Sequence, residues 1–160
     1  MGIFLRAYCA EDYLSLKPIL DDAFGVGYFD CNKLSNENCV VADMGTAAGM
    51  IYCEDHLGEL EVRTIAVRYD LRNQGIALCL LNHLVSTSVS NNIKRLWSPA
   101  WVERGRVPGA KLLVSAGFAL TSEISDYWLN DSIQRQYACP ACGMPCRCSA
   151  QIFEKLLVAY

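Results

Sequence analysis

The chain has 160 residues, of which 52% are hydrophobic and 19% are charged, and its formal net charge is −3 at pH 7. This length suits one domain, and the apolar fraction excludes a disordered chain. The acidic balance argues against a nucleic-acid-binding surface, and the longest apolar runs fall short of the about 20 residues that span a membrane. No basic and apolar leader opens the sequence, so we expect a cytoplasmic protein that contacts neither nucleic acid nor membrane.

Hydrophobic periodicity predicts strands and one amphipathic helix in the first half of the chain. The expected elements are a strand over 2–9, a helix from Glu11 to the glycines at 25 and 27, a short helix within 30–38, a hairpin of 39–43 and 48–54, and a strand over 59–67. In the last strand, strict alternation predicts that Glu59, Glu61, Arg63, Ile65 and Val67 share one face.

The second half predicts helices alternating with shorter strands. The expected elements are a helix over 75–88, a strand over 95–102 with Pro99 inside it, a helix over 107–116, strands over 118–123 and 125–130, and a strand or short helix over 150–159. The whole order predicts an α/β (α+β) sheet with helices on its faces.

One segment joins the strand over 59–67 to the following helix through Arg72-Asn73-Gln74-Gly75-Ile76-Ala77. The first turn of a helix has free N–H groups and positive dipole character, so this junction can hold phosphate groups. The segment lacks the Gly-Lys-Ser/Thr ending of a Walker A loop and the Gly-x-Gly-x-x-Gly of a dinucleotide site. The alternative is an ordinary helix N-terminus with a fortuitous glycine.

Ile65-Ala66-Val67 followed by Arg72-x-x-Gly75-x-Ala77 resembles the acetyl-CoA motif of the Gcn5-related N-acetyltransferase (GNAT) superfamily, and the later segment 110–118, ending in Gly-Phe, resembles its second hallmark. The resemblance covers about residues 2–130. It implies a mixed, mostly antiparallel sheet of six to seven strands, splayed between the strands over 59–67 and 95–102, with acetyl-CoA in the gap. It also implies cofactor contacts from Ile65, Ala66, Val67, Arg72, Asn73, Gln74, Gly75, Ile76 and Ala77.

The resemblance implies a general base on the strand over 59–67, where Glu61 is the preferred candidate and Glu59 the second. For either glutamate, the alternative is a solvated strand end. Arg63 stands where many relatives have an acid, and it could bind an acidic substrate or pair with Glu61. The usual tyrosine acid is replaced by Leu113, so Tyr127, or else Tyr69, is expected to supply the proton. Aromatic candidates for the amine pocket, or for the core, are Trp97, Trp101, Tyr28 and Phe29.

Nine cysteines include four within ten residues, Cys139, Cys142, Cys146 and Cys148. Cys139-Pro140-Ala141-Cys142-Gly143 resembles a zinc knuckle, and four thiolates suit tetrahedral Zn²⁺, with iron the weaker option. The site would be structural, within one chain or shared across a dimer, and the alternative is free or oxidised thiols. We expect residues 1–132 to form the GNAT domain and residues 133–160 a cysteine-rich extension packed on it.

These features lead to two hypotheses. The first is an N-acetyltransferase that moves an acetyl group directly from acetyl-CoA to a primary amine of a small molecule or peptide. A homodimer is one assembly that this enzyme could form. The second is a module of the same fold that senses acyl-CoA or scaffolds a partner without turnover, which the replacement of tyrosine by Leu113 supports.

Overall fold

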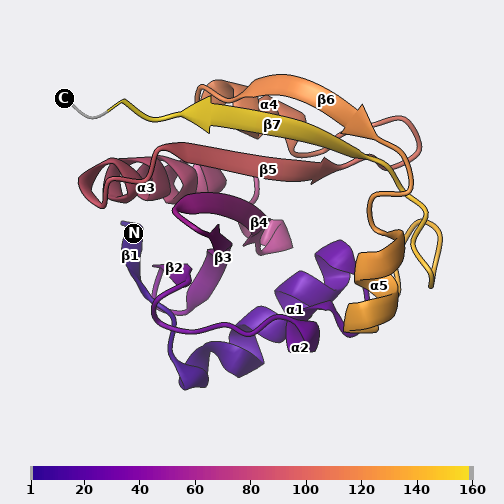
Figure 1. The fold of residues 1–160 in the computed structure, drawn as a ribbon. Helices are drawn as coiled ribbons and strands as arrows, with labels where there is room; N and C mark the ends of the chain where they lie inside the picture. The colour runs from indigo at the N-terminus through magenta and orange to yellow at the C-terminus, as the bar shows by residue number, and fades with distance from the viewer. Residues whose placement is uncertain (1, 159–160) are drawn as a thin grey trace.

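Seven strands form one sheet within residues 2–158, the part of the chain that this computed structural model describes (Figure 1). The strands are β1 (Phe4–Ala7), β2 (Cys39–Asp43), β3 (Ala47–His56), β4 (Glu59–Val67), β5 (Arg95–Trp101), β6 (Ala119–Ile124) and β7 (Ala150–Leu156). Their order is β1-β2-β3-β4-β5-β7-β6, and only β4 and β5 pair in parallel. The predicted mixed, mostly antiparallel sheet is confirmed.

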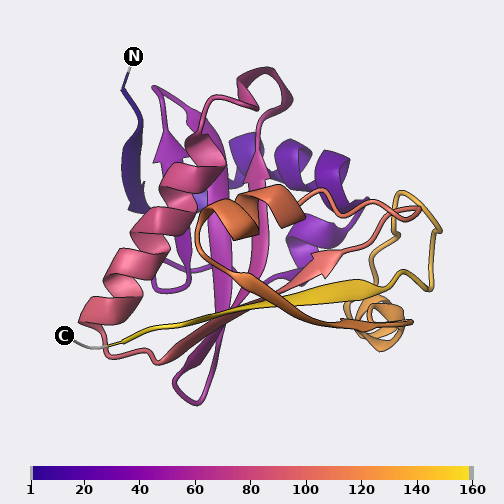
Figure 2. The ribbon, with the colours of Figure 1, turned by 90° about the horizontal axis from the view of Figure 1, so that it is seen from above.

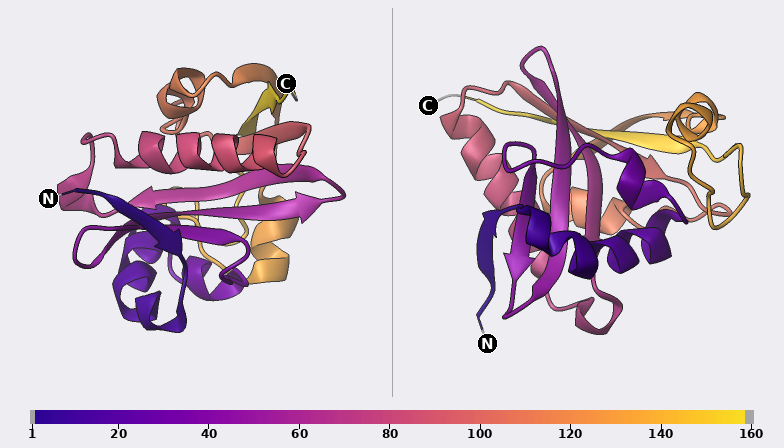
Figure 3. Two further views of the ribbon diagram at one scale, coloured as in Figure 1. Left: turned by 90° about the vertical axis from the view of Figure 1, so that its left-hand side faces the viewer. Right: turned by 90° about the horizontal axis from the view of Figure 1, so that it is seen from below.

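Helices cover both faces of this sheet (Figures 2 and 3). They are α1 (Tyr13–Phe24), α2 (Tyr28–Cys31), α3 (Ile76–Ser90), α4 (Ala110–Ser115) and α5 (Leu129–Arg135), with 3₁₀ turns η1 (Ala10–Asp12) and η2 (Tyr69–Leu71). Leu80 and Leu81 of α3 are fully buried in one core, and Leu16 and Leu20 of α1 are fully buried in the other. Within residues 2–158, no helix is both long and apolar enough to cross a membrane.

The predicted strand over 125–130 is wrong, because the chain turns away from the sheet there and enters α5. Asp126 has a φ of 51°, a left-handed conformation that interrupts an extended strand. Trp128 and Ser132 are four residues apart and both buried, which is the spacing of one helix face. The position beside β6 is taken by β7 instead.

The last strand of the chain lies inside the sheet, between β5 and β6 (Figure 1). Residues 150–156 therefore form a strand, one of the two predicted alternatives, and position 159 of the predicted segment lies outside the described residues. The expected boundary between a GNAT domain and its extension, at residues 132 and 133, stays a prediction. The strand of that extension, β7, pairs with β5 and β6 and so belongs to the same sheet.

A β-bulge interrupts β4 at Arg63. Tyr52 of β3 pairs with Thr64, and the next residue, Cys53, pairs with Val62, so Arg63 is the extra residue. A bulge of this kind shifts the alternation of side chains along the strand by one position.

The predicted common face of the β4 residues is wrong because of this bulge. Ile65 and Val67 pack in the core beneath α3. Arg63 instead contacts Asn32, which follows α2, and the carboxylate of Glu61. Glu61 and Arg63 thus face the opposite side of the sheet from Ile65 and Val67.

Asp12 joins β1 to the start of α1, and this link makes stability depend on pH. Its side chain is 6% exposed and accepts hydrogen bonds from Arg6 at 2.7 and 2.8 Å and from the Cys9 N–H at 3.0 Å. The Arg6 hydrogen bonds lower the pKa of Asp12 from 3.8 to about 2. Because the folded pKa is the lower one, the stabilisation is present above about pH 4 and is lost as the pH falls towards 2.

We expect Asp12→Asn to lower the free energy of unfolding at pH 7 by about 2 kcal/mol. The variant should also lose less stability than the wild type between pH 4 and pH 2, because it has no carboxylate to protonate. Urea unfolding at pH 7, 4 and 2 measures both effects. Equal pH dependence in the two proteins would contradict this role of Asp12.

Candidate functional site

The parallel strands β4 and β5 separate halfway along their length. Their backbone pairing runs from Glu59–Arg95 to Glu61–Trp97. Ser98 Oγ then donates to the carbonyl oxygen of Val62 at 2.9 Å, and the next residue of β5 is a proline, which has no N–H for a further ladder bond. A cavity of about 920 Å³, the large cavity, opens beyond this point.

One end of the large cavity, the α3 end, is lined by residues 72–73, residues 75–78 and Lys111. Gly75 precedes α3 with a φ of 82°, and a Cβ built on it would have no atom within 4 Å. No side chain caps this helix, so its first N–H groups are free and carry positive dipole character. Arg72, whose Nε donates to the carbonyl oxygen of Val67 at 3.1 Å, and Lys111 add positive charge. This end suits a pyrophosphate.

The residues predicted to contact the cofactor lie together along this cavity. Eight of the nine line it: Ile65, Ala66, Val67, Arg72, Asn73, Gly75, Ile76 and Ala77, while Gln74 lies beside them in the chain. Leu113 of α4 also lines the cavity and is 3% exposed. The position where the resemblance expects a tyrosine therefore presents an apolar side chain to the cavity.

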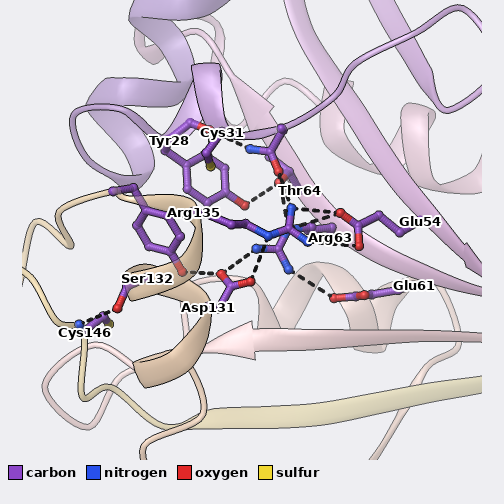
Figure 4. A network of polar contacts seen from close by, with 12 residues as sticks. Tyr28, Cys31, Glu54, Glu61, Arg63, Thr64, Asp131, Ser132, Arg135 and Cys146 are labelled. Atoms are coloured by element: carbon purple, nitrogen blue, oxygen red, sulfur yellow. Dashed lines mark hydrogen bonds and ion pairs between the residues drawn. The ribbon is translucent and has the colours of Figure 1, made fainter.

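The opposite end, the α5 end, is lined by Tyr28, Arg63, Trp128, Tyr137, Cys139 and Cys146. The Arg63 side chain is only 4% exposed, and its guanidinium pairs with Asp131 of α5 at 2.5 Å and with Glu61 at 3.6 Å (Figure 4). The Tyr137 hydroxyl donates to the same Asp131 oxygen. Burial, and next this hydrogen bond, raise the pKa of Tyr137 above its ordinary value.

Further polar contacts hold this end together. Arg135 of α5 pairs with Glu54 at 2.9 Å and with Asp131 at 3.0 Å. The hydroxyls of Tyr28 and Thr64 are 2.6 Å apart, and burial raises the pKa of Tyr28 to about 12. The network joins β3, β4, α2 and α5 (Figure 4). Two of its pairs have a local sequence signal: Asp131–Arg135, at i,i+4, and Glu61–Arg63, which the sequence analysis considered.

The predicted catalytic residues lie near a second, small cavity of about 430 Å³. Glu59 and Tyr127 line it together with His56. Glu61 is 4% exposed, and its Oε2 lies 2.9 Å from Nε2 of His56. Burial, and next the charge of Glu61, raise the pKa of Tyr127 to about 12. Arg95 pairs with Glu59 at 2.5 Å. The structure thus brings the three predicted residues to one region, separate from the lining of the large cavity.

The aromatic candidates for the amine pocket divide between these cavities. Tyr28 and Trp101 line the large cavity, and Trp97 lines the small one. Phe29 is 4% exposed and packs in the core beneath α1. Tyr137, which the sequence analysis did not single out, presents a hydroxyl at the α5 end.

The four clustered cysteines converge to a geometry that suits a metal ion. Their Sγ atoms all lie within 4.8 Å of one another, and three of the Sγ–Sγ pairs are 3.5, 3.6 and 3.9 Å apart. A tetrahedral Zn²⁺ with Zn–S bonds of about 2.3 Å needs S–S separations of about 3.8 Å, far longer than a disulfide bond. Cys139 and Gly143 exchange backbone hydrogen bonds of 3.0 and 2.8 Å, and Gly143 has a φ of 80°. The donors and their spacing fit zinc.

Comparison with known proteins identifies relatives of this architecture. The sequence model of the acetyltransferase (GNAT) family matches residues 5–118. No curated protein matches the sequence closely enough to indicate a relationship.

Among solved structures, the chain is similar to NAA60 of Arabidopsis thaliana in complex with acetyl-CoA (TM-score 0.75, 15% identity, covering 98% of this chain and 100% of that one). It is also similar to Ard1 from Thermoplasma volcanium (TM-score 0.74, 15% identity, covering 99% of each chain). A third similar structure is the ribosomal-protein-S18-alanine N-acetyltransferase from Escherichia coli (TM-score 0.72, 17% identity, covering 99% of this chain and 96% of that one). At these identities, the likeness shows a shared fold.

Proposed function

The chain belongs to the GNAT acetyltransferase family, and from that premise we propose that it transfers an acetyl group from acetyl-CoA directly to a primary amine. The observation that carries the proposal is the large cavity. It runs from the free N–H groups and positive charges of the α3 end, past the point where β4 and β5 separate, to the polar and aromatic α5 end. An extended thioester and an amine can therefore meet in one cavity.

The α3 end would bind the donor. The N–H groups at the start of α3, with Arg72 and Lys111, would hold the pyrophosphate, and the β4 backbone from Ile65 to Val67 would pair with the pantetheine. The amine nitrogen would attack the thioester carbon from the α5 end. The C–S bond then breaks, the amine proton passes to a base, and the thiolate takes a proton from an acid.

For the base we propose Glu61, acting through water, with Glu59 as the second candidate. Glu61 is the buried carboxylate of β4, and its partner His56 has a side chain 49% exposed. This pair offers the amine proton a route to solvent. Tyr127 is the proposed acid, because its hydroxyl is protonated at neutral pH. It lines the small cavity and not the large one, so its proton would reach the thiolate through water.

The proposal also includes a structural Zn²⁺ in the cysteine cluster. Four thiolates leave no coordination position for a substrate, so the ion would stabilise the chain rather than act in acyl transfer. A compartment that keeps thiols reduced, such as the cytoplasm, would preserve the ligands. A homodimer stays a prediction.

Acetyl-CoA turnover with a panel of amines tests the proposal. The panel should contain small primary amines and peptides, including peptides that begin with alanine, because the similar Escherichia coli enzyme is named for an alanine substrate. We expect Glu61→Gln to lower kcat about 100-fold or more, the range of general base catalysis, and to leave acetyl-CoA affinity unchanged.

Glu123→Gln is the matched control, because this glutamate is exposed on β6 and its side chain accepts a hydrogen bond only from Gln151 within residues 2–158. It should retain wild-type kcat. Retained turnover in Glu61→Gln would exclude this base. If the wild type bound acetyl-CoA but acetylated no amine in the panel, the sensing module would become the better description, as the apolar Leu113 at the cavity would then suggest.

A further inference from the structure

We propose that a metal ion held by Cys139, Cys142, Cys146 and Cys148 fixes the wall of the α5 end, so that metal loading governs binding of the amine and not of acetyl-CoA. The assignment of the two substrates to the two ends rests on the proposed function. The metal site and its contact with the cavity rest on geometry alone.

The segment that carries the ligands needs a cross-link to keep one conformation. Residues 136–149, all of them described by the structure, join α5 to β7 without a helix or strand of their own, and they contain one isolated β-bridge, between Cys139 and Gly143. The four Sγ atoms nevertheless converge, and the Arg147 N–H points at Cys142 Sγ at 3.4 Å. Backbone N–H groups directed at sulfur stabilise thiolates, the form that binds a metal.

A first set of contacts joins this cluster to α5. The Cys146 N–H donates to Ser132 Oγ at 2.8 Å, and Ser132 is fully buried (Figure 4). The preceding residue of α5, Asp131, accepts hydrogen bonds from Arg63 and Tyr137. A shift of Cys146 would therefore move α5 and its Asp131. The hydrogen bonds to Asp131 position Arg63 and Tyr137, which line the α5 end.

A second set of contacts joins the segment that carries the cysteines to the turn between α1 and α2. The Ala138 N–H donates to the carbonyl oxygen of Val26 at 3.3 Å, and a Cβ built on Gly25 would lie 1.7 Å from the carbonyl oxygen of Ala138. Tyr137 packs edge-on against Tyr28, with ring centroids 5.2 Å apart. The backbones approach so closely that the turn and the cysteine segment must move together.

The cysteine segment itself forms part of the cavity surface. Cys139, Pro140 and Cys146 line the large cavity beside Tyr28 and Tyr137. The α3 end is built from β4, α3 and α4, all of which precede residue 116 in the chain. Removal of the metal should thus reshape one end of the cavity and leave the other end in place.

The experiment compares the zinc-loaded, chelator-treated and zinc-restored forms of the full, reduced chain. We expect one zinc per chain, and after replacement by Co²⁺ an absorption spectrum with thiolate-to-metal charge-transfer bands and tetrahedral ligand-field bands. Chelation should raise the KM for the amine about 10-fold or more and change the calorimetric Kd for acetyl-CoA less than about 2-fold. Zinc should restore the amine KM.

Two variants and a control refine this test. Cys142→Ser should lose the metal and reproduce the chelated form, whereas Cys9→Ser, at an exposed cysteine beyond β1, should keep both metal and amine KM. Ser132→Ala keeps all four ligands but removes the hydrogen bond from Cys146. It should retain zinc, show a raised amine KM, and exchange amide hydrogens faster in residues 129–149.

Substoichiometric zinc, or a cobalt spectrum without thiolate bands, would overturn the metal site. Equal losses of amine and acetyl-CoA binding on chelation, or no loss of either, would overturn its role as the wall of the α5 end. If the zinc-loaded protein bound no acetyl-CoA, the proposed function would fail and this role with it, while the measured zinc content would still decide the metal site.

Discussion

Replacement of Gly75 by aspartate is expected to weaken acetyl-CoA binding about 100-fold or more, which corresponds to about 3 kcal/mol. The new carboxylate would lie at the start of α3, where the free N–H groups, Arg72 and Lys111 form the positive end of the cavity. It would repel the pyrophosphate and compete for the same N–H groups. Calorimetric titration of the reduced protein with acetyl-CoA measures the loss.

Gly58→Asp is the matched control for this substitution. Gly58 also has a positive φ, 89°, and open space around a built Cβ, but it lies in the exposed turn between β3 and β4. Both variants therefore introduce the same charge and a similar backbone strain, and only Gly75→Asp should lose affinity. Equal affinity in the two variants would show that the start of α3 does not bind the donor.

Asp131→Ala is expected to lower the free energy of unfolding by about 3–5 kcal/mol, the usual effect of removing one partner from a buried ion pair. Arg63 would keep its charge in a position where its side chain is 4% exposed, and it would lose its shortest contact, 2.5 Å to Asp131. Tyr137 would lose its acceptor at the same time. Urea unfolding at neutral pH gives the difference.

The control is Asp70→Ala. Asp70 pairs with Arg68 at 2.6 Å, a similar distance, but these side chains are 62% and 41% exposed. Solvent screens such a pair, so its removal should cost less than about 1 kcal/mol. If the two variants lost equal stability, the buried network would not be what holds α5 to β4.

The local motif at the α3 end could be predicted because its parts are close in the chain. The strand over 59–67 matches β4 at both ends, and the helix expected from Gly75 starts one residue later, at Ile76. Strand period, helix start and glycine conformation are properties of short segments, so their signal is present in the sequence. The resemblance to the GNAT superfamily identified Leu113 as the replaced tyrosine position, and its side chain lines the cavity.

The α5 end could not be predicted in this way, because its contacts join distant positions. Arg63 and Asp131 are 68 residues apart, and Tyr28 and Thr64 are 36 apart. Strict alternation predicts a shared face for Glu61 and Ile65, but one bulge residue in β4 places them on opposite faces, and alternation cannot reveal a bulge. The segment over 125–130 became a turn and the start of a helix, because β7 occupies the place beside β6.

The sequence by itself determined the class of fold, the strand-to-helix motif at Gly75 and the set of four cysteines, since each depends on local spacing or residue type. Only the tertiary structure decided that two of these cysteines line the same cavity as Gly75, and that Glu59 and Tyr127 line another. The physical reason is that β7 inserts between β5 and β6, which carries the segment before it back against the turn between α1 and α2. Such a long-range return of the chain depends on the packing of the whole sheet and has no signal in any short segment.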